Sequence, residues 1–232
     1  MSNLAVITAR GGSKRIPKKN IKEFCGKPIL CYSIAAALES GCFDEVMVST
    51  DSEDIREIAL QAGAKVPFLR SEQTSNDYAT TAQVLEEVLG EYKKQGRHFD
   101  VVCCIYPTAP FVTAGKLQNA MEKLQETGAD TVSPVVRFSY PPQRGFVVEQ
   151  GYMVMKWPEN RTARSQDLEP MYHDCGQFYC LNAASFLEQH QIFMKKMVSV
   201  EMPESEVQDI DTMEDWKIAE LKYRLMQEEM NE

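Results

Sequence analysis

The chain has 232 residues, enough for one globular domain with a substantial buried core. Hydrophobic residues make up 44%, charged residues make up 25%, and the formal net charge is -9 at pH 7. This acidic balance argues against non-specific binding to nucleic acid. No segment approaches the length of a membrane span, and residues 1–8 lack the charged leader and long apolar run of a signal peptide. We therefore expect a cytoplasmic protein with neither nucleic acid nor a membrane as partner.

Seven cysteines form an odd set without any C-x-x-C spacing. This pattern predicts reduced thiols rather than a disulfide framework or a zinc site. Cys103 and Cys104 lie in an apolar run and are expected to be small core residues.

The first predicted strand, residues 4–8, leads into a loop, Ala9–Asn20, that contains five basic residues. Gly11 and Gly12 allow a tight turn and leave backbone N–H groups free to face an anion. A loop at the carboxyl end of a strand in an α/β sheet is a usual phosphate site. A solvated basic loop that binds nothing is the alternative. The glycine spacing excludes both the G-x-G-x-x-G dinucleotide motif and the P-loop of kinase-like enzymes.

Strands and helices alternate along most of the remaining chain. We predict helices at 28–39, 54–62, 80–94 and 114–126, and strands at 46–50, 65–69, 101–106 and 131–136. This alternation indicates βαβ crossovers and an α/β fold with a three-layer, mostly parallel sheet. We interpret residues 1–232 as a single domain.

Residues 138–171 depart from this alternation. They contain four prolines and a Gln150-Gly151 turn between two apolar runs, at 146–148 and 152–155. This pattern predicts an antiparallel hairpin or a protruding arm. After it, a helix is expected to end near Met230, with an apolar stripe that packs on the domain; a coiled-coil partner is the weaker alternative.

Asp209 and Asp211 precede that last helix. In an extended segment residues i and i+2 face the same side, so both carboxylates are expected on one face. Two hard oxygen ligands suit a Mg²⁺ ion that also holds substrate phosphates. The alternative is that Asp211 or Thr212 only caps the helix.

The segment A-R-G-G-S-K-R-I-P-K-K-N-I after a first strand resembles the signature of the CMP-sugar synthetases, which transfer CMP from CTP to an acidic nine-carbon sugar. The resemblance extends over nearly the whole chain. It implies a Rossmann-like fold of the nucleotide-diphospho-sugar transferase type and a Mg²⁺ cofactor held by Asp209 and Asp211. It also implies a homodimer in which the arm, residues 138–171, reaches over the second subunit.

The resemblance implies that residues at matching positions of this chain contact the nucleotide. They are Arg10, Gly11, Gly12, Ser13, Lys14, Asn20, Arg70, Asp77, Ala79 and Thr81. Catalysis is assigned to Arg10, Lys14 and Asp211. The match around Arg70 is partial, because Ser71 replaces the proline of the family's R-P-x-x-L-A-x-D segment.

The expected sugar contacts lie in three later segments. They are Tyr106, Thr108, Arg164, Gln166, His173, Asp174, Gln177 and Tyr179. Tyr106 and His173 differ from the residues usual in sialic-acid enzymes, whereas Y-H-D-x-G-Q-F-Y at 172–179 resembles the branch that activates pseudaminic acid. Sialic or legionaminic acid as the substrate is one alternative, and a non-catalytic CTP-binding regulatory module is another.

Overall fold

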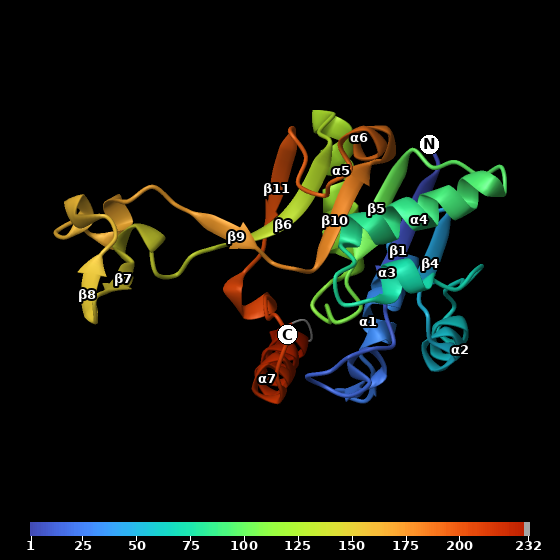
Figure 1. Ribbon diagram of the computed structural model, residues 1–232, viewed down its shortest axis with the longest axis horizontal. Helices are drawn as coiled ribbons and strands as arrows, with labels where there is room; N and C mark the ends of the chain where they lie inside the picture. The colour runs from blue at the N-terminus through green and yellow to red at the C-terminus, as the bar shows by residue number, and fades with distance from the viewer. Residues whose placement is uncertain (230–232) are drawn as a thin grey trace.

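A mixed sheet of seven strands forms the centre of the computed structural model, which describes residues 1–229 (Figure 1). The strand order is β11-β6-β10-β5-β1-β4, with β9 paired to β6. The strands are β1 Asn3–Thr8, β4 Glu45–Ser49, β5 Val101–Ile105, β6 Thr131–Arg137, β9 Tyr172–Asp174, β10 Phe178–Asn182 and β11 Met197–Glu201. Only β9 and β10 run against the other strands, so the sheet is mostly parallel, as predicted.

Helices cover both faces of this sheet, which confirms the three-layer prediction. One apolar cluster joins the sheet to α1 Leu30–Glu39, α2 Glu53–Gln61 and α5 Ala114–Thr127. The opposite face packs against α4 Thr81–Lys94 and α6 Ala183–Gln189. Cys103 contributes to the first cluster and Cys104 to the second, and neither is exposed. β5 is therefore buried on both faces, as its continuous apolar run predicted.

The strand predicted at 65–69 is wrong. Only Lys65 pairs, through a single parallel bridge to Met47, and the chain then leaves the sheet. Pro67 has no N–H to give to a ladder, which explains why pairing stops there.

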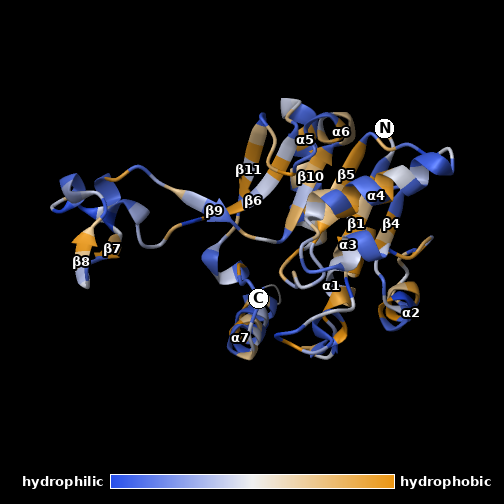
Figure 2. Cartoon of the chain, viewed as in Figure 1, coloured by the Kyte–Doolittle hydropathy of each residue, from blue (hydrophilic) through white to orange (hydrophobic). Residues whose placement is uncertain are grey.

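The predicted hairpin at 138–171 is confirmed and protrudes from the sheet (Figure 1). β7 Phe146–Glu149 pairs antiparallel with β8 Tyr152–Met155. Gln150 and Gly151 both have positive φ, at 49° and 85°, as a two-residue hairpin turn requires. Three short 3₁₀ turns, η2 Pro142–Arg144, η3 Pro158–Asn160 and η4 Ser165–Asp167, accompany the strands. Figure 2 shows apolar residues along this hairpin as well as along the central strands.

Helix α7, Met213–Glu229, packs on the second half of the basic loop and on the chain segment that follows it. Its buried residues Trp216, Ala219 and Met226 join Ile16 and Phe24 in a third apolar cluster. This segment also contains η1 Lys19–Ile21 and the short strands β2 Glu23–Phe24 and β3 Lys27–Pro28. The predicted stripe therefore packs within the domain; its last member, Met230, lies outside the described residues. Within residues 1–229, no helix combines the length and apolarity needed to cross a bilayer.

Candidate active site

A cavity of about 480 Å³ lies beyond the carboxyl ends of β1 and β5. Parallel strands bring their following loops together at this edge of the sheet. Twelve of the predicted site residues line it: Arg10, Ser13, Lys14, Asn20, Arg70, Asp77, Ala79, Thr81, Tyr106, Thr108, Asp209 and Asp211. The structure therefore gathers most of the predicted nucleotide contacts and both predicted metal ligands in one place.

The basic loop forms one wall of this cavity. Arg10 Nη1 donates to Asp77 Oδ1 at 2.8 Å, and Lys14 forms an ion pair with the other oxygen of the same carboxylate. Hydrogen bonds from Lys14 and Arg10 hold the pKa of Asp77 below its usual value. Two opposing loops, at 10–14 and 76–80, are thus joined through one side chain.

The two glycines of the loop do not line the cavity. The N–H of Gly11 donates to Asp51 Oδ1 at 2.8 Å, and a Cβ at this position would lie 3.0 Å from the Cβ of Ser52. Gly11 is needed for this close approach of two loops. The structure assigns no such constraint to Gly12, around which there is open space.

Asp211 faces the basic loop from the opposite wall. Its Oδ1 lies 2.6 Å from Arg15 Nη2 and 3.7 Å from Lys19 Nζ. The helix cap is formed by Thr212, whose hydroxyl accepts from the N–H of Asp215 at 3.2 Å, while the Asp215 carboxylate accepts from the N–H of Thr212. The Asp211 carboxylate is therefore not the helix cap and belongs to the cavity.

Lys19 is an addition to the predicted site. Its side chain is only 21% exposed, and its Nζ donates to the carbonyl of Ile210 at 2.6 Å. Burial lowers the pKa of Lys19, and the nearby carboxylates of Asp211 and Asp209 act to raise it. Arg15 also lines the cavity. The five basic residues of the loop were the sequence feature from which Lys19 and Arg15 could have been predicted as site residues.

Arg70 and Asn20 hold the backbone around the cavity. Arg70 is 8% exposed, and its guanidinium donates to the hydroxyl and the carbonyl of Ser49 at the end of β4. Burial lowers its pKa, while Asp51 and Glu87 act to raise it. Asn20 donates to the carbonyl of Arg10 at 2.9 Å. Arg70 thus fixes the end of β4, and Asn20 fixes the start of the basic loop.

Tyr106 connects the predicted nucleotide and sugar contacts. Its hydroxyl lies 3.1 Å from Thr81 Oγ1. Its ring packs edge-on against Tyr179, with centroids 5.7 Å apart, and Tyr179 donates to Asp174 Oδ2 at 2.5 Å. Tyr179 itself is buried beneath the cavity rather than lining it.

The remaining predicted sugar residues lie outside the cavity of the same chain. Gln177 is buried and donates to the carbonyl of Glu206 at 2.7 Å. His173 is exposed on β9, with its ring 4.7 Å from that of Phe138. Arg164 and Gln166 belong to the arm, where Arg164 pairs with Asp167 at 2.7 Å.

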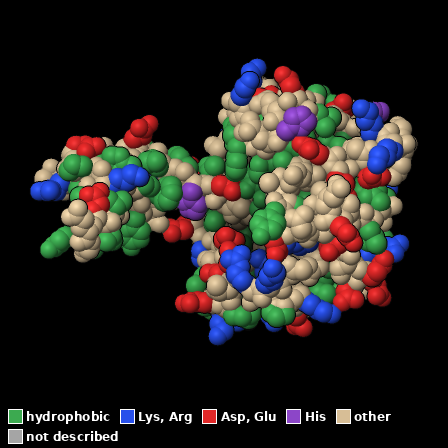
Figure 3. Space-filling model, viewed as in Figure 1, with side chains coloured by type: hydrophobic (Ala, Val, Ile, Leu, Met, Phe, Trp, Pro, Cys, Tyr) green, Lys and Arg blue, Asp and Glu red, His purple; other side chains and the backbone are tan. Residues whose placement is uncertain are grey.

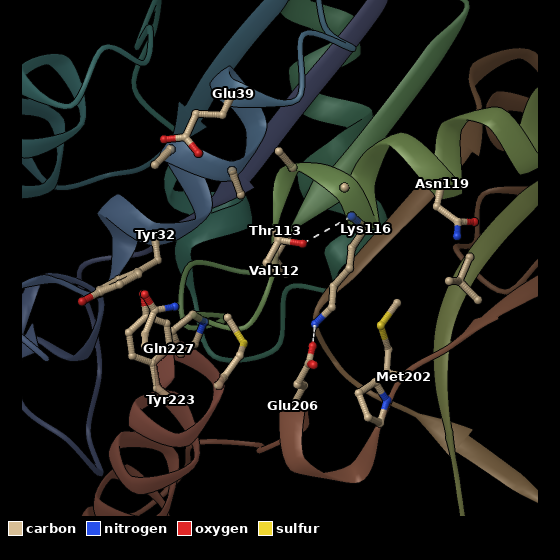
Figure 4. A pocket seen from close by; sticks show the side chains of 18 of the residues that line it. Tyr32, Glu39, Val112, Thr113, Lys116, Asn119, Met202, Glu206, Tyr223 and Gln227 are labelled. Atoms are coloured by element: carbon tan, nitrogen blue, oxygen red, sulfur yellow. Dashed lines mark hydrogen bonds and ion pairs between the residues drawn. The ribbon is translucent and has the colours of Figure 1, made fainter. Parts of the chain in front are cut away.

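A second, larger cavity of about 790 Å³ lies between α1, α5 and α7. Figure 4 shows Lys116 reaching across it to Glu206 of η5, Glu204–Glu206, with which it forms an ion pair. No predicted site residue lines this cavity. Its lining has two lysines against four glutamates, so it lacks the excess positive charge that a triphosphate needs.

Similarity to known proteins extends over nearly the whole chain. A cytidylyltransferase family model matches residues 4–223. A pseudaminic acid cytidylyltransferase from Campylobacter jejuni is 41% identical, covering 98% of this chain and 99% of its own. A CMP-N,N'-diacetyllegionaminic acid synthase from Legionella pneumophila is 35% identical, covering 98% of this chain and 99% of its own.

Among solved structures, a CMP:2-keto-3-deoxy-manno-octonic acid synthetase in complex with CTP superposes with a TM-score of 0.69 at 17% identity. The match covers 98% of this chain and 100% of that chain, and it supports the fold alone. Because the family model and the Campylobacter jejuni relative each span nearly the whole sequence, the chain belongs to the cytidylyltransferase family.

Proposed function

We propose that this cytidylyltransferase activates pseudaminic acid, transferring CMP from CTP to the sugar and releasing pyrophosphate. The observation that carries the proposal is the single cavity in which Arg10, Lys14 and Lys19 face Asp209 and Asp211. CTP has about four negative charges on its triphosphate, and nucleotidyl transfer depends on holding and neutralising them. The choice of sugar is supported by the Campylobacter jejuni relative and by the Y-H-D-x-G-Q-F-Y segment.

In this mechanism the anomeric hydroxyl of the sugar attacks the α-phosphorus of CTP. A bond forms between the sugar oxygen and phosphorus, the bond to the bridging oxygen of the pyrophosphate breaks, and the hydroxyl proton passes to solvent water. Arg10 can bind two phosphate oxygens through its planar guanidinium, whereas Lys14 acts as a movable point charge. Catalysis arises mainly from positioning and charge neutralisation.

Asp209 and Asp211 fit a divalent metal, which we propose is Mg²⁺. Both carboxylates line the cavity. No group of three or more potential protein ligands occurs within residues 1–229, so water and phosphate oxygens would complete the shell, as Mg²⁺ prefers. Bound there, the ion would supply positive charge to the triphosphate.

We also propose one nucleotidyltransferase domain with the arm as an insertion, acting as a cytoplasmic homodimer. The seven free cysteines fit a reducing compartment. Phe146, Val148 and Met153 share one face of the hairpin and are 57%, 74% and 72% exposed. Figure 3 shows hydrophobic side chains gathered on this arm. An isolated two-stranded hairpin is marginally stable, so covering this face by a second copy would stabilise it.

The dimer proposal gives a role to Arg164 and Gln166. Both lie on the arm, away from the cavity of their own chain, and a second copy would bring them to its neighbour's sugar site. Val148→Asp should produce a monomer by light scattering, whereas Glu149→Ser, on the opposite face, should not. A dimer that persists in Val148→Asp would contradict this arrangement.

The reaction itself is tested by incubating the protein with CTP, Mg²⁺ and purified pseudaminic, legionaminic or sialic acid. We expect the CMP-linked product and pyrophosphate with pseudaminic acid at the highest kcat/KM. CTP binding without pyrophosphate release from any of the three sugars would instead support a regulatory module.

A further inference from the structure

The two cations at the mouth of the cavity already have an anionic partner. The Asp77 carboxylate has one oxygen 2.8 Å from Arg10 Nη1 and the other on Lys14 Nζ. Arg10 also donates to the carbonyl of Asn76 at 3.2 Å. Each of the two residues offered to the triphosphate is therefore bound to the loop at 76–80.

The loop that carries Asp77 has a defined backbone. It connects α3, Glu72–Ser75, to α4. The side-chain oxygen of Asn76 accepts from the N–H groups of Tyr78 and Ala79, at 2.8 and 3.0 Å. This local turn fixes the backbone on both sides of Asp77. The loop thus keeps Asp77 beside the two cations, while its side chain can rotate away from them.

A carboxylate with one oxygen on each of two cations resembles a phosphate group in its charge and in the spacing of its acceptors. Because hydrogen bonds from Lys14 and Arg10 lower the pKa of Asp77, the carboxylate is ionised at neutral pH. A phosphate group and this carboxylate compete for the same donors.

We propose that Asp77 is an internal counter-ion that occupies an anion subsite in the ligand-free protein and is displaced by the triphosphate. The inference rests on the proposed function for the identity of the anion. A ligand must bring enough negative charge to displace the Asp77 carboxylate. This competition therefore favours the binding of CTP over that of CMP and CDP. Asp77 is thus a positioning residue that sets nucleotide selectivity.

The pair is displaceable because it is exposed. The side chains of Arg10 and Asp77 are 37% and 41% exposed, and that of Lys14 is 80% exposed. Ion pairs of this kind contribute little individually. We therefore expect the loss of the carboxylate to tighten anion binding by about three- to tenfold, in line with the small energies of such pairs.

A second ion pair of the basic loop provides a matched control. Lys18 Nζ lies 2.8 Å from Asp54 Oδ2, another exposed ion pair between the basic loop and a neighbouring element. Neither Lys18 nor Asp54 lines the cavity. Asp54→Asn therefore removes one carboxylate that pairs with the basic loop and changes the net charge equally, without touching the proposed subsite.

The test is calorimetric titration of inorganic pyrophosphate, and then of CMP, CDP and CTP, into wild type, Asp77→Asn and Asp54→Asn. We expect Asp77→Asn to bind pyrophosphate about three- to tenfold more tightly and to discriminate less between CMP and CTP, while Asp54→Asn matches wild type. Asp77→Glu, which keeps the charge, should restore the discrimination.

Unchanged or weaker pyrophosphate binding by Asp77→Asn would overturn the assignment. Weaker CTP binding with unchanged pyrophosphate binding would instead identify Asp77 as a contact of the nucleoside. If wild type bound neither pyrophosphate nor CTP, the proposed function would fail together with this inference.

Discussion

Asp211 Oδ1 lies 2.6 Å from Arg15 Nη2, so a residue that precedes helix α7 closes the cavity formed by the loop after β1. The basic loop and the Asp209–Asp211 segment, far apart in the sequence, are thus joined in one site. A metal held by the two carboxylates would lie beside the cations that we propose bind the triphosphate.

Replacing Asp211 should therefore affect turnover more than folding. We expect Asp211→Ala to lower kcat by about 100-fold, because it removes one of two proposed metal contacts. The measurement is pyrophosphate release in saturating Mg²⁺. Thr212→Ala is the control, since it should cost about 1 kcal/mol of stability as a lost cap and leave kcat within about twofold. Near-normal rates in Asp211→Ala would refute the metal assignment.

Lys19 should be required for efficient turnover of CTP, whereas its neighbour Lys18 should not. Lys19→Met keeps the buried stem and removes the charge next to Asp211, so we expect kcat/KM for CTP to fall by about tenfold or more. Lys18→Met should stay within about twofold, because Lys18 is 71% exposed and lies outside the cavity. Equal effects of the two changes would contradict this distinction. Steady-state kinetics at varied CTP concentrations provides the comparison.

His173 should influence the choice of sugar rather than nucleotide binding. It lies on β9 at the base of the arm, outside the cavity. We expect His173→Arg to change the ratio of kcat/KM between pseudaminic and sialic acid by about tenfold, the range that altered pocket contacts usually give, with the Kd of CTP unchanged. An altered CTP affinity with the sugar ratio intact would remove His173 from the sugar site.

Glu45 should make stability dependent on pH. Its side chain is 1% exposed and is hydrogen-bonded by Tyr92, Lys65 and Arg97. Burial alone would raise its pKa, but these bonds together bring the pKa below the ordinary value of 4.5. The resulting stabilisation is complete above the unfolded-state pKa and is lost as the pH falls through the lower folded-state value.

Glu45→Gln should therefore lower the free energy of unfolding at pH 7 by about 2 kcal/mol and flatten its dependence on pH below 5. Glu91→Gln breaks the exposed pair with Lys94 and should cost less than about 0.5 kcal/mol. Urea unfolding at several pH values measures both. A Glu45→Gln variant with the pH profile of wild type would show that this carboxylate is not linked to stability.

Local signals predicted much of the fold. The apolar run at 101–106 and the Gln150-Gly151 turn each depend on neighbouring residues, and the structure confirms the elements they predicted. No local pattern predicts the elements of residues 178–201, where the structure has β10, α6 and β11. β10 is antiparallel between β5 and β6, and this pairing depends on residues far away in the sequence.

For the site, too, local features could be predicted from the sequence and long-range contacts could not. The loop and the aspartate pair were recognisable from composition and spacing, as was the resemblance that placed them together. The role of Lys19 was not, because its partner Ile210 is distant in the chain and only the fold brings them together. The resemblance predicts Asp77 as a nucleotide contact, and the structure places its carboxylate on two cations. Such competition between a ligand and an internal anion leaves no pattern in the sequence.

The packing of α7 against Ile16 and Phe24 has a consequence for how the protein matures. The basic loop emerges early from the ribosome, but the apolar residues beside it stay uncovered until α7 has been synthesised. A nascent chain that ended before Asp209 would also lack both predicted metal ligands. The walls of the cavity are thus complete, and their apolar support is covered, only after translation has passed this helix.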